Sequence, residues 1–129
     1  MSGNFLLDTN AAIAYLAQNA ALLTIIEAAD EIFVPSVVLG ELFYGAEKSG
    51  RSEANRRNVE TLAVSGAVLN CDIGTAREYG RIRNLLRTKG RLIPHNDTWI
   101  AAIAMQHGLT VLTRDKHFDD VDGLAKQGW

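Results

Sequence analysis

The sequence predicts an α/β fold, a three-layer sandwich in which helices flank a central parallel sheet of four to five strands. Short apolar runs of strand length alternate with longer segments of helical periodicity. The chain has 129 residues, of which 47% are hydrophobic and 22% are charged, as in an ordinary globular protein. This length suits one domain spanning residues 1–129.

The predicted strands are short apolar runs bounded by turn residues or by proline. They cover residues 5–7, 31–35, 66–70 and 109–113, and the tail from Leu124 to Trp129 adds a short last strand. Right-handed crossovers restrict these strands to a few arrangements. If the first and fourth strands are neighbours, Asp8 and the turn at residues 113–115 meet in one crevice at the carboxyl edge of the sheet.

The predicted helices occupy the segments between these strands. They cover residues 10–18, 20–29, 37–48, 53–64, 72–89 and 96–106. Ser36 stands where the N-cap of the third helix belongs, and Gly90 ends the longest helix as a C′ glycine does. The inner side of that longest helix is expected at Ile73, Ala76, Tyr79 or Gly80, Ile82 or Arg83, and Leu86.

The composition indicates an intracellular protein. Cys71 is the single cysteine, which excludes an intramolecular disulfide and suits a reducing compartment. No apolar run approaches the roughly 18 residues of a membrane span, and Asp8 interrupts what would be the core of a signal peptide. We therefore expect a cytoplasmic protein without membrane attachment.

The charges are unevenly distributed along the chain. Residues 1–47 contain six acids and no lysine or arginine, whereas residues 48–91 contain ten bases against four acids. The basic residues that crowd the longest predicted helix are Arg77, Arg81, Arg83 and Arg87. They are either a solvated helix face or contacts to the phosphates of a nucleic acid.

Four acids stand at positions where an acid needs an explanation. Asp8 ends the first strand, and Asp115 follows the fourth. Glu41 interrupts a helical segment that is otherwise uncharged, and glutamate is almost never fully buried without a partner. Asp97 begins a helix and points along its inner stripe. All four can reach the crevice that the first and fourth strands would form.

Each of these acids also has a purely structural explanation. Asp8 or Asn10 suits the N-cap of the next helix, and Asp97 in a first helical turn complements the helix dipole. Asp115 is also an ordinary turn residue, and Glu41 could pair with a buried arginine. These separate explanations leave the convergence of the four acids unexplained.

Carboxylates gathered in one crevice require a cation. Two of them about 5 Å apart repel each other by roughly 3 kcal/mol at an effective dielectric constant near 20. Because oxygen ligands without a His or Cys cluster favour Mg²⁺ or Mn²⁺ over zinc, we expect one of these two ions. Such an ion is the usual device for phosphoryl transfer, in which it activates a water and stabilises the leaving oxygen.

Four motifs in this sequence resemble those of a known family. They are Asp8-Thr9-Asn10, Glu41 within residues 38–45, Asn96-Asp97 followed by residues 99–102, and Thr113-Arg114-Asp115 with Phe118. In order and spacing they resemble the PIN-domain ribonucleases, and more narrowly the VapC-type toxins of bacterial toxin–antitoxin pairs. The resemblance covers essentially the whole chain.

The resemblance implies a PIN-like, metal-dependent endoribonuclease that leaves a 5′-phosphate and a 3′-hydroxyl. The catalytic and metal-binding residues it implies are Asp8, Glu41, Asp97 and Asp115, with Thr113, Thr9 and Asn10 as supporting polar groups. Either Asp119 or Asp120 is a candidate to supplement the metal ligands. The implied partners are RNA, a second copy of the chain and a cognate antitoxin.

Three other functions compete with this interpretation. A haloacid-dehalogenase-type phosphatase would use Asp8 as nucleophile, but Asn10 stands where that family has a second aspartate. A non-catalytic binding module would keep the acids as structure and bind no Mg²⁺ or Mn²⁺. A metal-free ribonuclease would use two of His95, His107 and His117 as acid and base, which leaves the four acids unexplained.

Overall fold

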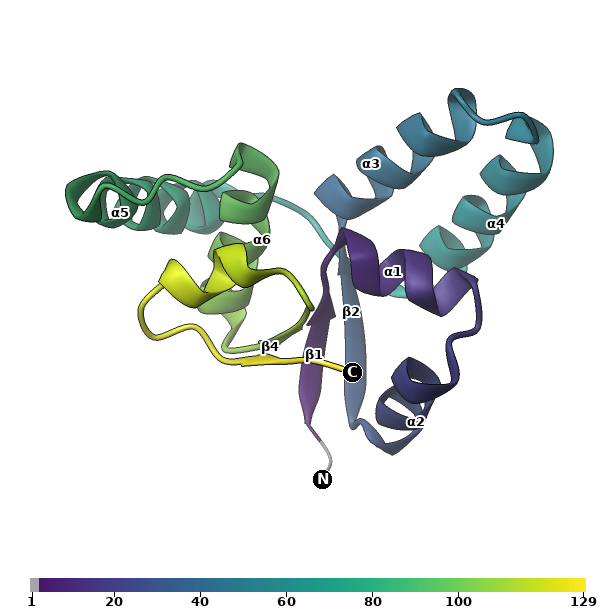
Figure 1. Ribbon diagram of the computed structural model, residues 1–129, viewed down its shortest axis with the longest axis horizontal. Coiled ribbons are helices and arrows are strands. Elements are labelled where there is room, and N and C mark those ends of the chain that lie inside the picture. The colour runs from purple at the N-terminus through teal and green to yellow at the C-terminus, as the bar shows by residue number, and fades with distance from the viewer. Residues whose placement is uncertain (1–2) are drawn as a thin grey trace.

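The computed structural model describes residues 3–129, which form strands and helices in alternation (Figure 1). The strands are β1 (Asn4–Leu7), β2 (Glu31–Pro35), β3 (Ala67–Leu69), β4 (Thr110–Leu112) and β5 (Lys126–Gln127). The helices are α1 (Thr9–Leu16), α2 (Ala20–Ala28), α3 (Ser36–Glu47), α4 (Ser52–Ser65), α5 (Ile73–Lys89), α6 (His95–His107) and the 3₁₀ helix η1 (Lys116–Asp120).

The five strands form one parallel sheet in the order β3-β2-β1-β4-β5. The central strand β1 pairs Leu6 with Phe33 of β2 on one side and with Val111 of β4 on the other. Leu6 and Val111 are fully buried because helices cover both faces of the sheet. The predicted parallel α/β sheet is confirmed, including its short last strand and the pairing of the first and fourth strands.

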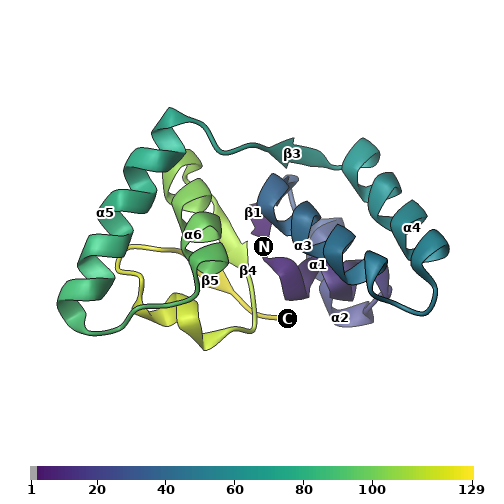
Figure 2. The ribbon, with the colours of Figure 1, turned by 90° about the horizontal axis from the view of Figure 1, so that it is seen from above.

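The helices lie in two groups around the sheet. Figure 2 shows α1 to α4 on one side of the molecule and α5 with α6 on the other. The chain passes outward from β1 through β2 to β3, then crosses back through α5 and α6 to β4 on the far side of β1. The strand order therefore reverses between β1 and β4, and in parallel sheets this switch point opens a crevice at the carboxyl ends of the strands.

Two details of the helices differ from the predictions. Ser36 is not the N-cap of α3: it is the first helical residue, and Pro35 holds the N-cap position without a side-chain hydrogen bond. In α5 the buried residues are Thr75, Ile82 and Leu86, and the predicted inner residue Ile73 is 71% exposed. The first turn of α5 is positioned by the capping box of Asp72 and Thr75, which turns the threonine inward in place of Ile73 and Ala76.

Within residues 3–129, no single helix is long and apolar enough to cross a membrane; α1 and α2 reach that length only as a pair bent by 102°.

Candidate active site

A cavity of about 250 Å³ lies at the switch point, where β1 and β4 end and α1, α3 and α6 approach one another. We call it the acidic cavity. Its lining residues are Asp8, Thr9, Asn10, Glu41, Pro94, Asn96, Asp97, Asp115 and His117. The structure therefore brings together all four acids that the sequence singles out, from four separate segments of the chain.

Asp8 combines a structural role with a place in this cavity. It is the N-cap of α1, because its Oδ1 atom accepts a hydrogen bond of 2.8 Å from the backbone N–H of Ala11. Its Oδ2 atom accepts a short hydrogen bond from the Thr113 hydroxyl. Asp8 is only 3% exposed. Burial raises the pKa of Asp8, and the charges of Asp97 and Asp115 raise it further. The two hydrogen bonds lower the pKa but do not offset these effects.

Asp97 occupies the first turn of α6, where an acid also complements the helix dipole. Its carboxylate is almost completely buried, and its Oδ2 atom lies 2.9 Å from Nδ1 of His117. Burial raises the pKa of Asp97, the hydrogen bond to His117 lowers it, and the charge of Asp115 raises it again. The helix start thus delivers a second poorly solvated carboxylate to the cavity.

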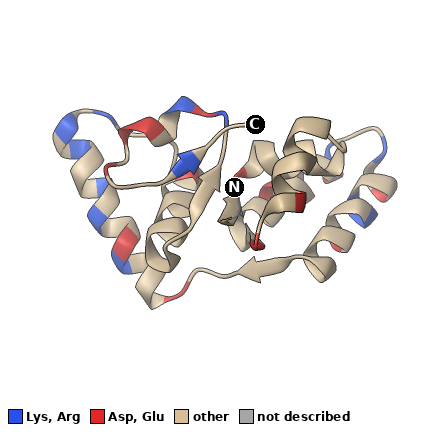
Figure 3. Ribbon diagram, turned by 90° about the horizontal axis from the view of Figure 1, so that it is seen from below, with Lys and Arg blue, Asp and Glu red and all other residues tan. Residues whose placement is uncertain are grey.

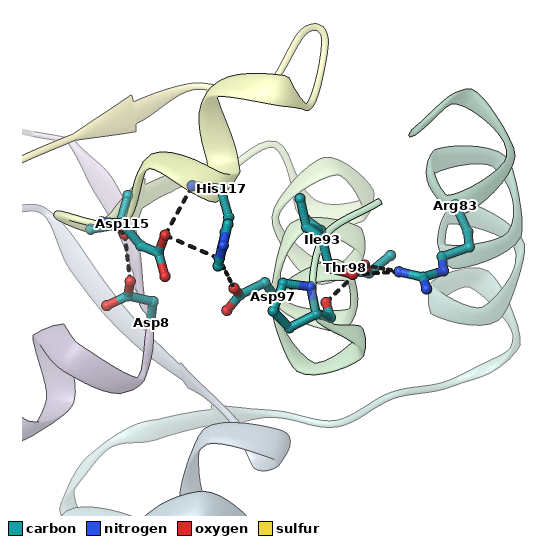
Figure 4. Close-up of polar contacts among 9 residues, drawn as sticks. Asp8, Arg83, Ile93, Asp97, Thr98, Asp115 and His117 are labelled. Carbon is teal, nitrogen blue, oxygen red and sulfur yellow. Dashed lines mark hydrogen bonds and ion pairs between the residues drawn. The ribbon is translucent and has the colours of Figure 1, made fainter. Parts of the chain in front are cut away.

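Asp115 follows β4 and caps η1. Its Oδ1 atom accepts a hydrogen bond of 2.9 Å from the backbone N–H of His117 and lies 3.1 Å from Nδ1 of the same histidine (Figure 4). The Asp115 backbone N–H donates to the Thr113 hydroxyl at 2.9 Å. Thr113, which is itself buried, therefore links Asp8 to the backbone that carries Asp115.

Glu41 reaches the acidic cavity from the second turn of α3. Its side chain is half-buried, and it forms no ion pair with any residue of the described chain. The arginine partner that sequence alone allowed is therefore absent from residues 3–129. Glu41 also lines a neighbouring, more apolar groove of about 360 Å³ between α1, α3 and α4.

The donor atoms of the cavity suit a divalent metal ion. Asp97, Asp115 and His117 each offer an atom within 4.8 Å of the other two. No second group of this kind occurs among residues 3–129. Asp8 and Glu41 line the same cavity but do not belong to this triad. The Thr9 hydroxyl is buried at the cavity and has no hydrogen-bond partner in the described chain. Two carboxylates, an imidazole and an unsatisfied hydroxyl form a polar, anionic setting that fits Mg²⁺ or Mn²⁺.

His117 is the residue of this triad that sequence reasoning did not assign to the metal site. Its pKa is raised, first by the hydrogen bond to Asp97 and also by the charges of Asp115 and Asp97. The sequence does carry one signal for the position of His117. Asp115 stands two residues before it, and an aspartate often accepts a hydrogen bond from the backbone N–H two residues on, in an Asx turn. Of the three histidines, His117 alone lines the acidic cavity, so a two-histidine mechanism lacks its second member there.

The arginines of α5 differ in how they are engaged. Figure 3 shows Lys and Arg positions along α5 and α4, at the two outer sides of the molecule. Arg83 turns inward and donates to the carbonyl oxygen of Ile93 and to the Thr98 hydroxyl (Figure 4). Arg81 pairs with Glu78 and Arg87 donates to Asn84; both arginines are exposed, and each of these partners lies three residues earlier on α5 itself.

The two acids beyond Phe118 have partners of their own outside the acidic cavity. Asp119 lies 3.4 Å from Lys126, and Asp120 lies 4.0 Å from Arg91. Neither lines the cavity, so the structure does not bring them to the predicted metal ligands.

Comparison with known proteins agrees with this architecture. The model of the PIN domain family matches residues 5–124. The chain is 31% identical over 97% of both chains to ribonuclease VapC2 of Haemophilus influenzae. It is 37% identical over 74% of both chains to the tRNA(fMet)-specific endonuclease VapC of Shigella flexneri. The crystal structure of DNA-bound VapBC from Salmonella typhimurium contains a similar chain, with a TM-score of 0.89 and 32% identity over 98% of each chain.

Proposed function

The chain belongs to the PIN domain family and is an endoribonuclease toxin of the VapC type, and we propose that it hydrolyses RNA in the acidic cavity with the help of Mg²⁺ or Mn²⁺. One observation carries this proposal. Asp8, Asp97 and Asp115 converge at the switch point of the sheet without a lysine or arginine partner in the described chain. Among the described residues His117 is the cationic partner of Asp97 and Asp115, and Asp8 has no such partner. Acids gathered with so little compensating charge are costly as structure, and a bound cation lowers that cost.

The residues of the cavity have different roles in this proposal. Asp97 and Asp115 would hold the ion, with Asp8 and Glu41 adding negative charge at its side. Thr113 fixes the orientation of Asp8 through its hydroxyl. When bound, the ion lowers the pKa of the attacking water and offsets the charge that develops on the phosphate. Thr9 and Asn10 line the same cavity, where they would act as supporting polar groups.

The substrate and partners follow from the family. The Shigella relative is named for tRNA(fMet), which makes tRNA the first class of RNA to examine. The Salmonella relative forms a VapBC complex, which supports a cognate antitoxin as partner, and we propose that the chain also forms a homodimer. An RNA substrate and a single cysteine suit the cytoplasm.

We assign RNA phosphate contacts to Arg77, Arg81 and Arg87, which lie on the exposed part of α5. Arg83 differs from them because it is half-buried and donates to Ile93 and Thr98 outside α5, whereas Arg81 and Arg87 are exposed and bonded to partners on α5 itself. Its contribution to RNA binding is therefore expected to be the smallest of the four.

The test is cleavage of total bacterial RNA by the purified chain, with the cleaved ends mapped. We expect cleavage in Mg²⁺ or Mn²⁺, none in excess chelator, and products with a 5′-phosphate. Asp97→Asn should abolish cleavage, whereas the matched variant Asp72→Asn, outside the cavity, should retain it. Undiminished cleavage by Asp97→Asn, or in chelator, would overturn the proposal. Calorimetry that finds no binding of either ion would favour the non-catalytic module.

A further inference from the structure

Resting on the proposed function, we propose that His117 is a direct metal ligand, which coordinates through Nδ1 beside Asp97 and Asp115 and gives the site a preference for Mn²⁺ over Mg²⁺. The acids alone would make an all-oxygen site. A nitrogen ligand changes which divalent ion binds best, and so narrows the identity of the cofactor.

The geometry around Nδ1 is that of neighbouring ligand atoms. Nδ1 of His117 lies 2.9 Å from Oδ2 of Asp97 and 3.1 Å from Oδ1 of Asp115. Two ligand atoms at about 2.1 Å from an octahedral ion, in adjacent positions, are about 3.0 Å apart. Both separations match that value. Figure 4 shows the imidazole between the two carboxylates, with the ring edge that carries Nδ1 turned toward them.

Local structure holds the imidazole in this position. The His117 backbone N–H donates to Oδ1 of Asp115 at 2.9 Å, which fixes the turn that carries the ring. The next residue, Phe118, is fully buried and anchors η1 to the core. The His117 side chain is 48% exposed, so the ring is open to solvent on its other side. A ligand fixed by its neighbours loses little freedom when it binds an ion.

The chemistry of the donors then sets the preference. Mg²⁺ binds oxygen ligands and is reluctant to give up its waters. Mn²⁺ also binds carboxylates well, but as a transition-metal ion it accepts an imidazole nitrogen more readily than Mg²⁺ does. The alternative role for His117 is a hydrogen-bond donor that orients Asp97 without touching the ion. In that role the histidine would support both ions alike, and its nitrogen would not bond to either.

Pulsed electron paramagnetic resonance on the Mn²⁺-loaded full-length chain separates these roles. We expect hyperfine coupling of a histidine ¹⁴N nucleus to Mn²⁺ in the wild type, its loss in His117→Gln, and its retention in His107→Gln. His107 is a matched control because it is exposed at the end of α6 and outside the cavity. Mn²⁺ bound without nitrogen coupling in the wild type would overturn the inference, whether or not the variants fold.

Calorimetric titrations with each ion give a second, independent readout. His117→Gln should weaken Mn²⁺ binding at least about tenfold, with a clearly smaller loss for Mg²⁺. Equal losses for the two ions would assign His117 the orienting role and overturn the inference.

The two proposals fail separately. A chain that cleaves RNA only with metal but shows no nitrogen coupling keeps the proposed function and loses the ligand assignment. A chain that shows the coupling but cleaves no RNA keeps the ligand assignment and loses the proposed function. Failure of Mn²⁺ to bind would overturn the ligand assignment, and failure of both Mn²⁺ and Mg²⁺ to bind would overturn both proposals.

Discussion

Asp8 and Asp72 both cap a helix, but their surroundings differ. Each is the N-cap of a helix, and each accepts a hydrogen bond from the backbone N–H three residues on. Asp72 is exposed, and the hydrogen bonds from Thr75 and Gln106 hold its pKa below the usual range. Asp8 is buried beside two other acids, and its pKa is raised. A cap alone therefore accounts for Asp72 and not for Asp8.

A functional acid differs from a structural one in the balance between its hydrogen bonds and the burial and charges around it. Hydrogen bonds to a capping carboxylate favour its charged form, so the pKa falls unless something stronger opposes them. At Asp8 two hydrogen bonds are present, yet burial and the neighbouring charges outweigh them. The surroundings of Asp8 therefore disfavour its charged form, as the surroundings of active-site acids often do.

The largest expected difference is in activity. Asp8→Asn keeps a capping oxygen but removes one negative charge from the cavity, and we expect RNA cleavage to fall by at least about a hundredfold. Asp72→Asn should cleave at close to the wild-type rate. Initial rates on one RNA at saturating Mg²⁺ measure both variants. Equal rates would show that Asp8 is only a cap.

Each of the two capping acids has a buried threonine as a hydrogen-bond partner. Thr113 donates to Asp8, and Thr75 donates to Gln106 and accepts from the backbone of Asp72. Replacing either by Val should lower the free energy of unfolding by about 1–3 kcal/mol, because buried partners lose a hydrogen bond. Thr113→Val should also lose about tenfold in cleavage rate, since Asp8 is no longer held in place. A similar loss of activity in Thr75→Val would contradict the distinction.

A smaller effect concerns the stability of the metal-free protein. Asp8→Asn relieves repulsion from Asp97 and Asp115, so the free energy of unfolding at pH 7 should rise by about 1 kcal/mol. Asp72→Asn removes a favourable charge at a helix start, so the melting temperature should fall by about 1–2 °C. Thermal melts in chelator report both changes. A large loss of stability in Asp8→Asn would mark this residue as structural.

The smallest effects appear in the pH dependence of stability without metal. The folded state holds the Asp8 proton more tightly than the unfolded state, so the stability from this group falls as pH rises above the unfolded pKa of 3.8. Asp72 has the opposite sign, and its contribution is lost as pH falls below 3.8. Melting temperatures are measured between about pH 3 and 8. Compared with the wild type, the melting temperature of Asp8→Asn should vary less with pH above about pH 4, and that of Asp72→Asn should vary less below about pH 4. The reverse pattern would contradict the assigned shifts.

Local patterns in the sequence predicted most of this fold and the membership of the cavity. Apolar runs and turn residues located the strands to within a residue or two. The acids stood out because Asp8 and Asp115 follow strands, Glu41 interrupts an apolar helix and Asp97 begins a helix on its inner side. Gly90 and Gly108 end α5 and α6 with positive φ, as the predicted helix ends require. These signals are local, so one sequence is enough to show them.

Contacts that depend on tertiary structure were not predictable in this way. His117 meets Asp97 across twenty residues, and nothing near either residue indicates that contact. Arg83 resembles its neighbours in sequence, yet it alone reaches the carbonyl oxygen of Ile93. The Thr75 hydroxyl also donates to Gln106 of the adjacent helix α6, a contact that the local capping box does not indicate. Each case requires knowing which helices pack together.

Stabilisation by Mn²⁺ of the two capping variants shows directly whether Asp8 contributes to metal binding. Thermal melts of the wild type, Asp8→Asn and Asp72→Asn with and without saturating Mn²⁺ compare the caps under one condition. The account predicts that Mn²⁺ raises the melting temperature of Asp72→Asn as much as that of the wild type, and raises that of Asp8→Asn far less. Equal rises in the two variants would contradict the account, because Asp8 would then contribute nothing to metal binding.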